Sequence, residues 1–211
     1  AFDIEKPQHS VFLPEFYIGK YPITNAQFNL FRKQNKKFSP FPDLPNEYFM
    51  HPVTGICWDD AMEFCYWLSA IKNLPIRLPT EAEWEKSARG TNANQWPWGN
   101  DLPSRLLCNS DGLVGNTTPV GAYSPQGDSP FGCADMSGNV WEWCNDRYNS
   151  NYYASLKGIS NNPQGAEKSY DPDEKYSLKR VIRGGSFLCN DSYCSGYRVS
   201  RRMKSSYDTG L

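Results

Sequence analysis

The first third of the chain alternates short apolar runs with turn residues and then shows helical periodicity. Residues 11–23 (VFLPEFYIGKYPI) are rich in aromatic and β-branched side chains, which favours short strands. Thr24 and Gln27 follow as a capping box, in which each side chain accepts from a backbone N–H of the other residue. The spacing of Phe28 and Phe31 predicts that they form the buried face of this first helix.

Two further helices are predicted downstream. Residues 58–72 (WDDAMEFCYWLSAIK) carry two aspartates at the favourable N-terminal end and apolar side chains at helical spacing, namely Ala61, Phe64, Cys65, Leu68 and Ile71. Residues 78–90 (LPTEAEWEKSARG) repeat the T-x-x-E capping box with Thr80 and Glu83, place Trp84 toward the core, and stop at Gly90. We expect Cys65 to be a buried core thiol.

From Thr91 onward the periodicity fails for most of the remaining chain. Gly, Pro, Asn, Asp, Ser and aromatic residues dominate, with short apolar runs such as TPVGAY and RVIRGGSF. This pattern indicates loops and short strands, and acidic or amide side chains on a cation are one way to order such a stretch. No repeat or linker divides the sequence, so we expect one domain over residues 1–211.

Composition narrows the class of protein. The 211 residues include 22 Lys and Arg against 23 Asp and Glu, a balance that argues against nucleic acid as a partner. No long apolar run and no leader-like N-terminus is visible, so we expect no membrane segment and a cytoplasmic location. Aromatics at 15% with 16 Gly and 16 Pro predict packed rings under many turns.

The seven cysteines are an odd number, so internal disulfides leave at least one thiol over. None forms a C-x-x-C pair, and the two histidines, His9 and His51, are far apart, which makes a structural zinc site improbable. Cys189 and Cys194 lie five apart in GGSFLCNDSYCSGYR and need a loop to converge. Two convergent thiolates would favour Cu(I), while a surface disulfide, or one buried and one exposed thiol, is the alternative.

Six phrases, taken together, carry a resemblance to a known family. They are FYIGKYPITNAQF, HPVTGICWDDAMEFCYWL, RLPTEAEWEKSARG, WPWGN, DMSGNVWEWCND and RVIRGGSF, and the set resembles the formylglycine-generating enzyme and sulfatase-modifying-factor family from about Phe16 to Leu211. The resemblance implies an α+β fold of the C-type-lectin-like kind, loop-rich, with a small mixed sheet. The usual opening strand and the closing G-F-R strand of that family are absent from these residues.

The resemblance also implies roles for particular residues. Cys189 and Cys194 match the copper-binding cysteines of the formylglycine-generating oxidases, Ser186 matches their catalytic-site serine, and Trp141 matches a tryptophan lining the active site. Tyr193 and Arg198 match further positions of the motif, which we interpret as substrate-binding. Nearby basic residues would favour the thiolate if they are close in space, and these are Arg183, Arg198, Arg201, Arg202 and Lys204.

Calcium is the second cofactor that the resemblance implies. Asp135, Gly138, Val140 and Glu142 match a structural Ca²⁺ site, and their oxygen ligands across a glycine turn suit that ion. The alternative is a turn held by hydrogen bonds and packed by tryptophans. A second calcium would match Asn109, Ser110 and Asp111, in a loop that is shorter here.

Two classes of function remain open from the sequence. The resemblance implies a copper-dependent oxidase that uses O₂ to convert a cysteine of a sulfatase-type C-x-P-x-R motif to formylglycine. The iron enzymes of the superfamily need several histidines, which this chain lacks. The alternative is a non-catalytic binding protein for an unknown protein ligand, such as a retroelement-diversified variable receptor or a domain of a larger signalling or defence protein.

Overall fold

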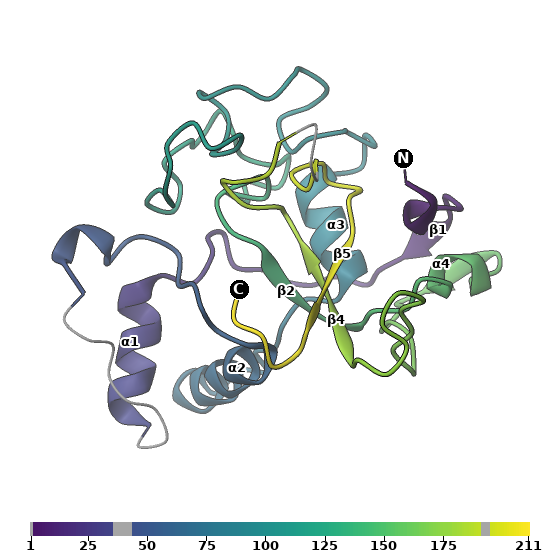
Figure 1. The fold of residues 1–211 in the computed structure, drawn as a ribbon, viewed down its shortest axis with the longest axis horizontal. Coiled ribbons are helices and arrows are strands. Elements are labelled where there is room, and N and C mark those ends of the chain that lie inside the picture. The colour runs from purple at the N-terminus through teal and green to yellow at the C-terminus, as the bar shows by residue number, and fades with distance from the viewer. Residues whose placement is uncertain (1, 36–43, 191–194) are drawn as a thin grey trace.

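The computed structural model describes residues 2–35, 44–190 and 195–211 and centres on a small antiparallel sheet (Figure 1). Its three strands are β2 (Glu142–Arg147), β4 (Lys179–Arg183) and β5 (Met203–Ser206), in the order β2-β4-β5. Trp143 pairs with Ile182, which pairs in turn with Met203. A separate pair, β1 (Ser10–Phe12) and β3 (Ile159–Asn161), is parallel, so the expected parallel and antiparallel pairings occur in two separate small sheets.

The helices begin where the sequence predicts. The helix α1 (Asn25–Gln34) starts after Thr24 and α3 (Glu81–Arg89) after Thr80, each with a complete capping box. The longest helix, α2 (Trp58–Lys72), follows Cys57 and ends at Asn73, whose left-handed backbone closes it. Three short helical segments complete the set: the 3₁₀ turns η1 (Asp3–Glu5) and η2 (Asn46–Tyr48), and α4 (Tyr152–Ser155).

Aromatic rings fill the contact between α1 and α2. Phe28 stacks on Phe64 at 5.5 Å between ring centroids, and Phe31 meets the same ring edge-on at 5.7 Å. Cys65 is buried beside this region, and burial raises the pKa of its thiol to about 11, as expected of a core thiol. The prediction for Ile71 is wrong, because the C-terminal end of α2 extends beyond its packing partners and leaves Ile71 53% exposed.

The second core lies between α3 and the sheet, where Trp84 is fully buried against Tyr148 and Val181. Charged side chains also join α3 to the sheet in this core. Glu81 of α3 accepts from Arg183 of β4 at 2.8 Å and from Arg202, just before β5, at 2.9 Å. Burial opposes ionisation of Glu81, but the two arginines outweigh it and lower the pKa of this carboxyl. Helix α3 is therefore fixed to the sheet by charge as well as by packing.

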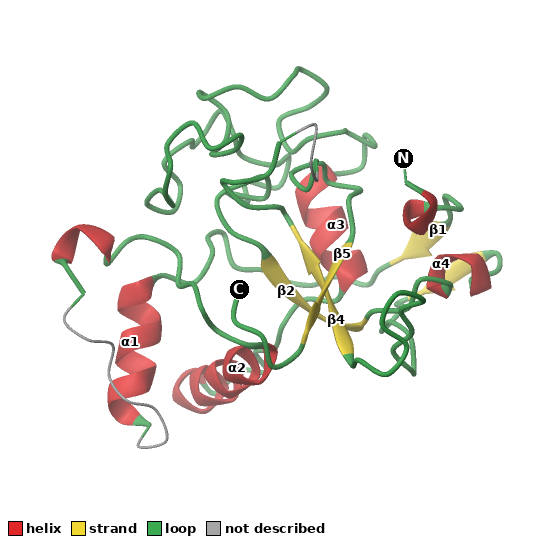
Figure 2. Cartoon of the chain, in the orientation of Figure 1, coloured by secondary structure: helices red, strands yellow, loops and turns green. Residues whose placement is uncertain are grey.

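Loops make up much of the molecule, as Figure 2 shows. Between α3 and β2 the described chain has turns and isolated bridges but no helix or strand, so TPVGAY forms turns, whereas RVIRGGSF contains β4. Residues 11–23 form a strand only over Val11 and Phe12, since Pro14 and Pro22 interrupt the backbone donors that a longer strand needs. No helix in the described ranges has the length and apolar character needed to cross a bilayer.

Candidate functional site

Cys189 lies in a tight turn directly after the sheet. Its N–H donates to the carbonyl of Ser186 at 3.0 Å, and its sulfur lies 3.4 Å from the backbone nitrogen and 3.8 Å from Oγ of Ser186. The N–H of Leu188 donates to the same hydroxyl oxygen at 3.3 Å. Cys189 is buried and disulfide-bonded in the structure. Ser186 and Cys189, predicted as partners in one site, are thus brought together.

Aromatic rings surround this sulfur. Cys189 packs in one buried cluster with Trp96 and Tyr197, and Trp98 and Trp141 close the cluster from the side. Trp96 and Trp98 are parallel, with ring centroids 6.4 Å apart. Trp141 therefore lies beside Cys189, and its role in an active site stays a prediction.

Gly196 makes this close packing possible. A Cβ at Gly196 would stand 2.6 Å from Cη2 of Trp141, too close for a side-chain carbon, and 3.0 Å from Sγ of Cys189, which is a tight contact. The glycine thus lets the backbone pass between the indole and the sulfur. Neither Gly196 nor Trp96 was assigned a role in the site from the sequence. WPWGN was noted only as one of the phrases that carry the family resemblance.

Two loops hold the cysteine turn in place. Phe187 donates its N–H to the carbonyl of Asn139 at 3.0 Å, which ties the turn to the DMSGNVWEW phrase. On the other side, Asp111 donates to the carbonyl of Cys189 at 2.8 Å and Gly112 to that of Phe187 at 2.7 Å. These three hydrogen bonds hold the turn through backbone groups alone.

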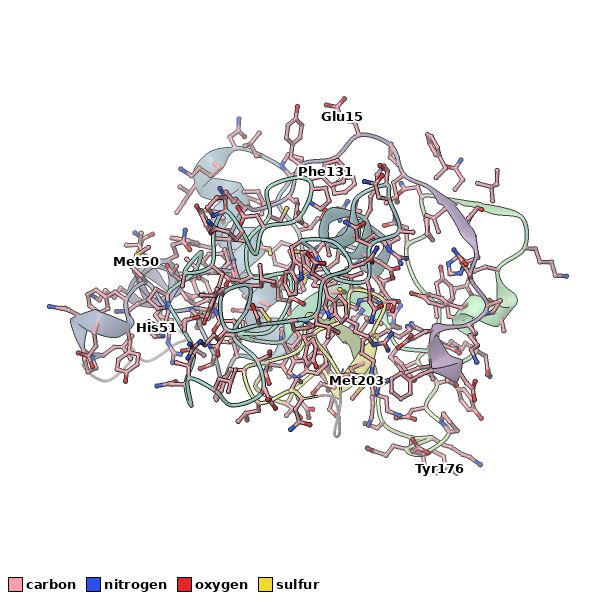
Figure 3. The ribbon with its side chains drawn as sticks, turned by 90° about the horizontal axis from the view of Figure 1, so that it is seen from above. Glu15, Met50, His51, Phe131, Tyr176 and Met203 are labelled. Atoms are coloured by element: carbon pink, nitrogen blue, oxygen red, sulfur yellow. The ribbon has the colours of Figure 1, made fainter. Side chains whose placement is uncertain are left out.

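A cleft of about 480 Å³ opens beside the turn and reaches to the start of α1. Trp141, Ser186 and Leu188 form one wall, and Tyr48 and Thr117 contribute to another. His51 lies behind Thr117, with Nδ1 2.8 Å from its hydroxyl oxygen, and burial lowers the pKa of this imidazole. Figure 3 shows His51 beside Met50 near one side of the molecule and Tyr176 well away from both.

The remaining predicted residues of the cysteine site are placed unequally. Tyr193 and Cys194 lie outside the described residues. Arg198 donates to Glu5 at 2.8 Å and is not among the described residues that line the cleft. Its role in substrate binding stays a prediction.

The nearby basic side chains do not act as the sequence suggested. Arg183 and Arg202 are fully buried on Glu81, and Lys204 pairs with Asp171 and Asp173. Arg198 and Arg201 both approach Glu5. These positive charges are paired with carboxylates, so the expectation that they favour a cysteine thiolate is wrong. Glu81 could not be predicted as the partner of Arg183 from nearby sequence, because it lies 102 residues before it.

The residues predicted to bind calcium form an acidic turn in which Asp135 and Glu142 are half-buried. Glu142 accepts from the indole N–H of Trp84 through Oε2 at 3.0 Å, while its Oε1 is buried without a hydrogen-bond partner among the described residues. Asp135 accepts from the N–H of Gly121 at 2.6 Å. Burial raises the pKa of Glu142 to about 7 and that of Asp135 to about 6, and the charge of Asp135 adds to the effect on Glu142.

The turn between these two acids has an unusual backbone. Gly138 and Asn139 both have positive φ, 80° and 63°. A Cβ at Gly138 would overlap the carbonyl oxygen of Asn109, so glycine is required there. Two half-buried carboxyl groups around such a turn, one with an unpaired oxygen, fit the ligand chemistry of Ca²⁺. Gly138 and Val140 would add backbone carbonyls to the set.

The second predicted calcium group lies next to the cysteine turn. Asn109 donates through Nδ2 to the carbonyl of Asn116 at 2.9 Å, and its Oδ1 is buried without a described partner. Ser110 Oγ lies 3.4 Å from the sulfur of Cys108, and Asp111 is exposed. The backbone N–H of Asp111 donates to the carbonyl of Cys189, so this segment supports the cysteine turn whether or not it binds an ion.

The fold and the cysteine turn together define a sulfatase-modifying-factor type of domain. The family model described as "Sulfatase-modifying factor enzyme 1-like domain" (FGE-sulfatase) matches residues 1–210, and the chain belongs to this family. The fold is the loop-rich α+β fold of the C-type-lectin-like kind, as predicted.

Two relatives and one solved structure show what the chain is similar to. The chain is 37% identical to the formylglycine-generating enzyme of Thermomonospora curvata over 187 residues, 81% of this chain and 54% of that protein. It is 30% identical to the serine/threonine-protein kinase pkn1 of Chlamydia caviae over 90% of this chain and 31% of that protein. The solved structure of Treponema denticola variable protein 1 superposes with a TM-score of 0.71 at 22% identity, covering 92% of this chain and 80% of that chain, which shows the fold alone.

The chain spans about half the length of the formylglycine-generating enzymes of Thermomonospora curvata and Streptomyces coelicolor, 54% and 49% respectively. The similarity therefore covers the domain that contains the cysteine turn, the cleft and the acidic turn, and does not extend over the whole of those proteins.

Proposed function

We propose that this domain is a copper-dependent oxidase that converts a cysteine side chain of a sulfatase-type protein substrate to formylglycine. The observation that supports it most is the position of Cys189, a buried sulfur beside Ser186 and Trp141 where both residues also line the cleft. Family membership and the similarity to formylglycine-generating enzymes supply the chemistry.

The cysteine site suits a soft, low-coordinate metal ion. Thiolate sulfur is a soft ligand, and soft ligands favour Cu(I) over hard cations. Cys189, with Cys194 as its proposed partner, would hold Cu(I) through thiolates once the disulfide at Cys189 is reduced. When bound, copper would supply redox chemistry with O₂.

The overall reaction is an oxidation followed by a hydrolysis. The substrate thiol loses two electrons and two protons to O₂, which becomes hydrogen peroxide, and the thiol becomes a thioaldehyde. Water then replaces the sulfur, which leaves as hydrogen sulfide. The aldehyde that remains is formylglycine. The C-x-P-x-R sequence of the substrate belongs to the same proposal.

The residues of this chain position the reactants. The Ser186 N–H and hydroxyl lie against the sulfur of Cys189 and would orient it, and the hydroxyl would position the incoming substrate. Trp96, Trp141 and Tyr197 exclude water from the sulfur, which lowers the local dielectric and protects a reactive thiolate from side reactions. The backbone contacts from Asn139 and Asp111 keep this geometry fixed.

The acidic turn would hold calcium in a supporting role. Asp135 and Glu142 are expected to be ionised around the ion, which removes their mutual repulsion. Phe187 donates to the carbonyl of Asn139 within the same turn, so an ordered acidic turn helps to order the cysteine turn.

The experiment that tests the oxidase is direct. The reduced, copper-loaded protein is incubated in air with a peptide containing C-x-P-x-R, and aldehyde is trapped with an aminooxy reagent and identified by mass spectrometry. We expect aldehyde with the wild type and none with Cys189→Ser. The matched control is Cys65→Ser, another buried thiol in a different core, which keeps activity. Aldehyde formation by Cys189→Ser would overturn the proposal.

Copper binding has its own test. The reduced protein is titrated with Cu(I) under anaerobic conditions against a competing chelator. One tight equivalent is expected, absent in the Cys189→Ser, Cys194→Ser double variant and retained in Cys65→Ser. No competitive binding by the wild type would favour a non-catalytic binding domain instead.

A further inference from the structure

A second cavity, of about 760 Å³, lies between α3 and the N-terminal segment, and we call it the α3 cavity. Its walls come from α3 on one side and from β1 and α4 on the other, and Figure 1 shows β1 and α4 next to each other beside α3. Among the described residues, none lines both this cavity and the cleft beside the cysteine turn. The volume is in the range of about 300–1,000 Å³ that is usual for small-molecule sites. The proposed oxidase makes no use of this cavity, so an occupant would have a separate role.

Asp146 lines the α3 cavity at the N-terminal end of α3. The residue is 3% exposed, and its Oδ2 accepts from the N–H of Glu81 at 2.8 Å. Within residues 2–35, 44–190 and 195–211, Asp146 forms no ion pair and its Oδ1 accepts no hydrogen bond. A buried carboxylate is ordinarily paired with a cation, because removing its charge from water is costly. Asp146 can therefore accept from a cationic donor in the cavity.

The other carboxyl groups of the lining are already paired with arginines. These pairs are Glu5 with Arg198, Glu81 with Arg202, and Glu85 with Arg89. Lys86 also lines the cavity, but its backbone lies five residues beyond Glu81, about 7.5 Å further along the helix axis. Burial and the charge of Glu81 raise the pKa of Asp146, although Arg202 and Arg183 oppose this shift from a longer range. Asp146 is thus the carboxyl group of the described lining that lacks a cation in direct contact.

Apolar and aromatic side chains form another part of the wall. Val11, Leu13 and Leu156 line it, and the ring of Tyr153 meets that of His9 edge-on, with 4.5 Å between centroids. An occupant with a charge alone would leave this apolar surface uncovered, and a wholly apolar occupant would leave Asp146 without a cation. The two features together favour a molecule with an ammonium group at one end and hydrocarbon at the other.

We propose that the α3 cavity binds a primary amine with an apolar or aromatic body. The ammonium group donates to the carboxylate of Asp146, and the hydrocarbon part packs on Val11, Leu13 and Leu156. A carboxylate or phosphate group beside Asp146 would meet a like charge and is rejected. The amine site goes beyond the proposed oxidase and does not depend on it, since no residue of the cysteine turn takes part.

The test compares two amines with two alcohols of the same shape. Phenethylamine and isoamylamine, and separately phenethyl alcohol and isoamyl alcohol, are titrated into the protein at about pH 8 by isothermal titration calorimetry. The ammonium group is charged at this pH, whereas the hydroxyl that replaces it is neutral. The variants are Asp146→Asn, which removes the charge, and Ala82→Leu, which fills the cavity from the second residue of α3. Cys189→Ser reports on the cysteine turn.

Each cavity variant has a matched control. Asp60→Asn changes another carboxyl group that accepts a backbone N–H at the start of a helix, from Cys57 at 3.3 Å. Ala26→Leu repeats the Ala82 substitution at the second residue of α1, where the side chain is exposed. Neither Asp60 nor Ala26 lines the α3 cavity.

We expect the wild type to bind at least one amine, and to bind the matching alcohol about tenfold or more weakly, the range of a charge-assisted hydrogen bond. Asp146→Asn loses a similar factor for the amine, and Ala82→Leu loses amine binding altogether. Both controls and Cys189→Ser keep the wild-type affinity. Because Asp146 also accepts from the first residue of α3, unfolding is measured in parallel, and Ala82→Leu decides if Asp146→Asn does not fold.

Three results would overturn the proposal: no binding of either amine, equal binding of an amine and its alcohol, or undiminished amine binding by Ala82→Leu. Loss of amine binding in Cys189→Ser would place the amine at the cysteine turn and would also overturn it. No part of the test requires copper or aldehyde formation, so failure of the amine site and failure of the oxidase are distinguishable.

Discussion

Gly196 and Trp141 are in such close contact that a single carbon atom added to the glycine would stand 2.6 Å from the indole ring. The same carbon would press on the sulfur of Cys189 at 3.0 Å. One backbone position therefore controls the spacing between the ring that lines the cleft and the cysteine that we propose binds copper. The first prediction follows from this contact.

Gly196→Ala should displace Trp141 or Cys189 and reduce aldehyde formation more than it reduces stability. Overpacking of this kind costs about 1–3 kcal/mol. Unfolding in urea and turnover are measured together. The control is Gly19→Ala, where the new carbon would have only an ordinary contact at 3.5 Å. Equal turnover by both variants would show that the spacing does not matter.

Ser186→Ala removes the hydroxyl that lies 3.8 Å from the cysteine sulfur and accepts from Leu188. We expect a stability loss of about 0.5–1.5 kcal/mol, the net value of one hydrogen bond. Turnover should fall while Cu(I) affinity is retained, because the sulfur remains in place. Turnover at the wild-type level would leave Ser186 as a turn residue only.

Calcium should stabilise the protein more as the pH rises. The pKa values of Glu142 and Asp135 are raised by burial to about 7 and about 6, so without an ion their contribution to stability is present at low pH and is lost as the pH rises toward 7. Calcium binds the ionised pair and opposes that loss. Thermal unfolding with Ca²⁺ or a chelator should coincide near pH 4.5 and separate near pH 7.5.

The matched control for calcium is Glu142→Gln. This variant keeps the shape of the side chain and an oxygen near Trp84 but removes one charge, so the calcium-dependent increase in melting temperature should shrink. A calcium effect of the same size in Glu142→Gln, or none in the wild type at pH 7.5, would count against the site at the acidic turn.

Glu81→Gln should be the most destabilising of these changes. It leaves Arg183 and Arg202 buried without their shared carboxylate, and removing one partner of a buried ion pair costs about 3–5 kcal/mol. Urea unfolding measures it, with the exposed Glu167→Gln as a control expected within about 0.5 kcal/mol of the wild type. A loss no larger than that of the control would mean that water or Glu85 compensates the arginines.

The sequence predicted local structure well and distant partnerships poorly. The capping boxes at Thr24 and Thr80 depend on residues three apart, and both are present. The burial of Ile71 depends on how far α1 extends along α2, which periodicity does not contain. Trp96 packs with Cys189, more than ninety residues later, and Glu81 pairs with Arg202, 121 residues later. Contacts between residues so far apart leave no pattern in the nearby sequence.

The cysteine site was predicted from the resemblance to the formylglycine-generating enzyme family. The structure brings Ser186, Cys189 and Trp141 together, and their roles stay predictions. Physical reasoning from spacing alone left a disulfide, a buried thiol and a metal site open. The basic residues near the end of the chain are a different case. Because they are close in sequence, they were expected to act together on the cysteine, but in the structure they pair with separate carboxylates.

The sharing of Glu81 by Arg183 and Arg202 also has a consequence for synthesis on the ribosome. When α3 has left the ribosome but β4 has not, Glu81 lacks the two arginines that neutralise it in the folded core. Docking of that helix must wait until Arg202 has also emerged, 121 residues after Glu81, so we expect the domain to fold late in its own synthesis and to depend on chaperones when elongation pauses before β5.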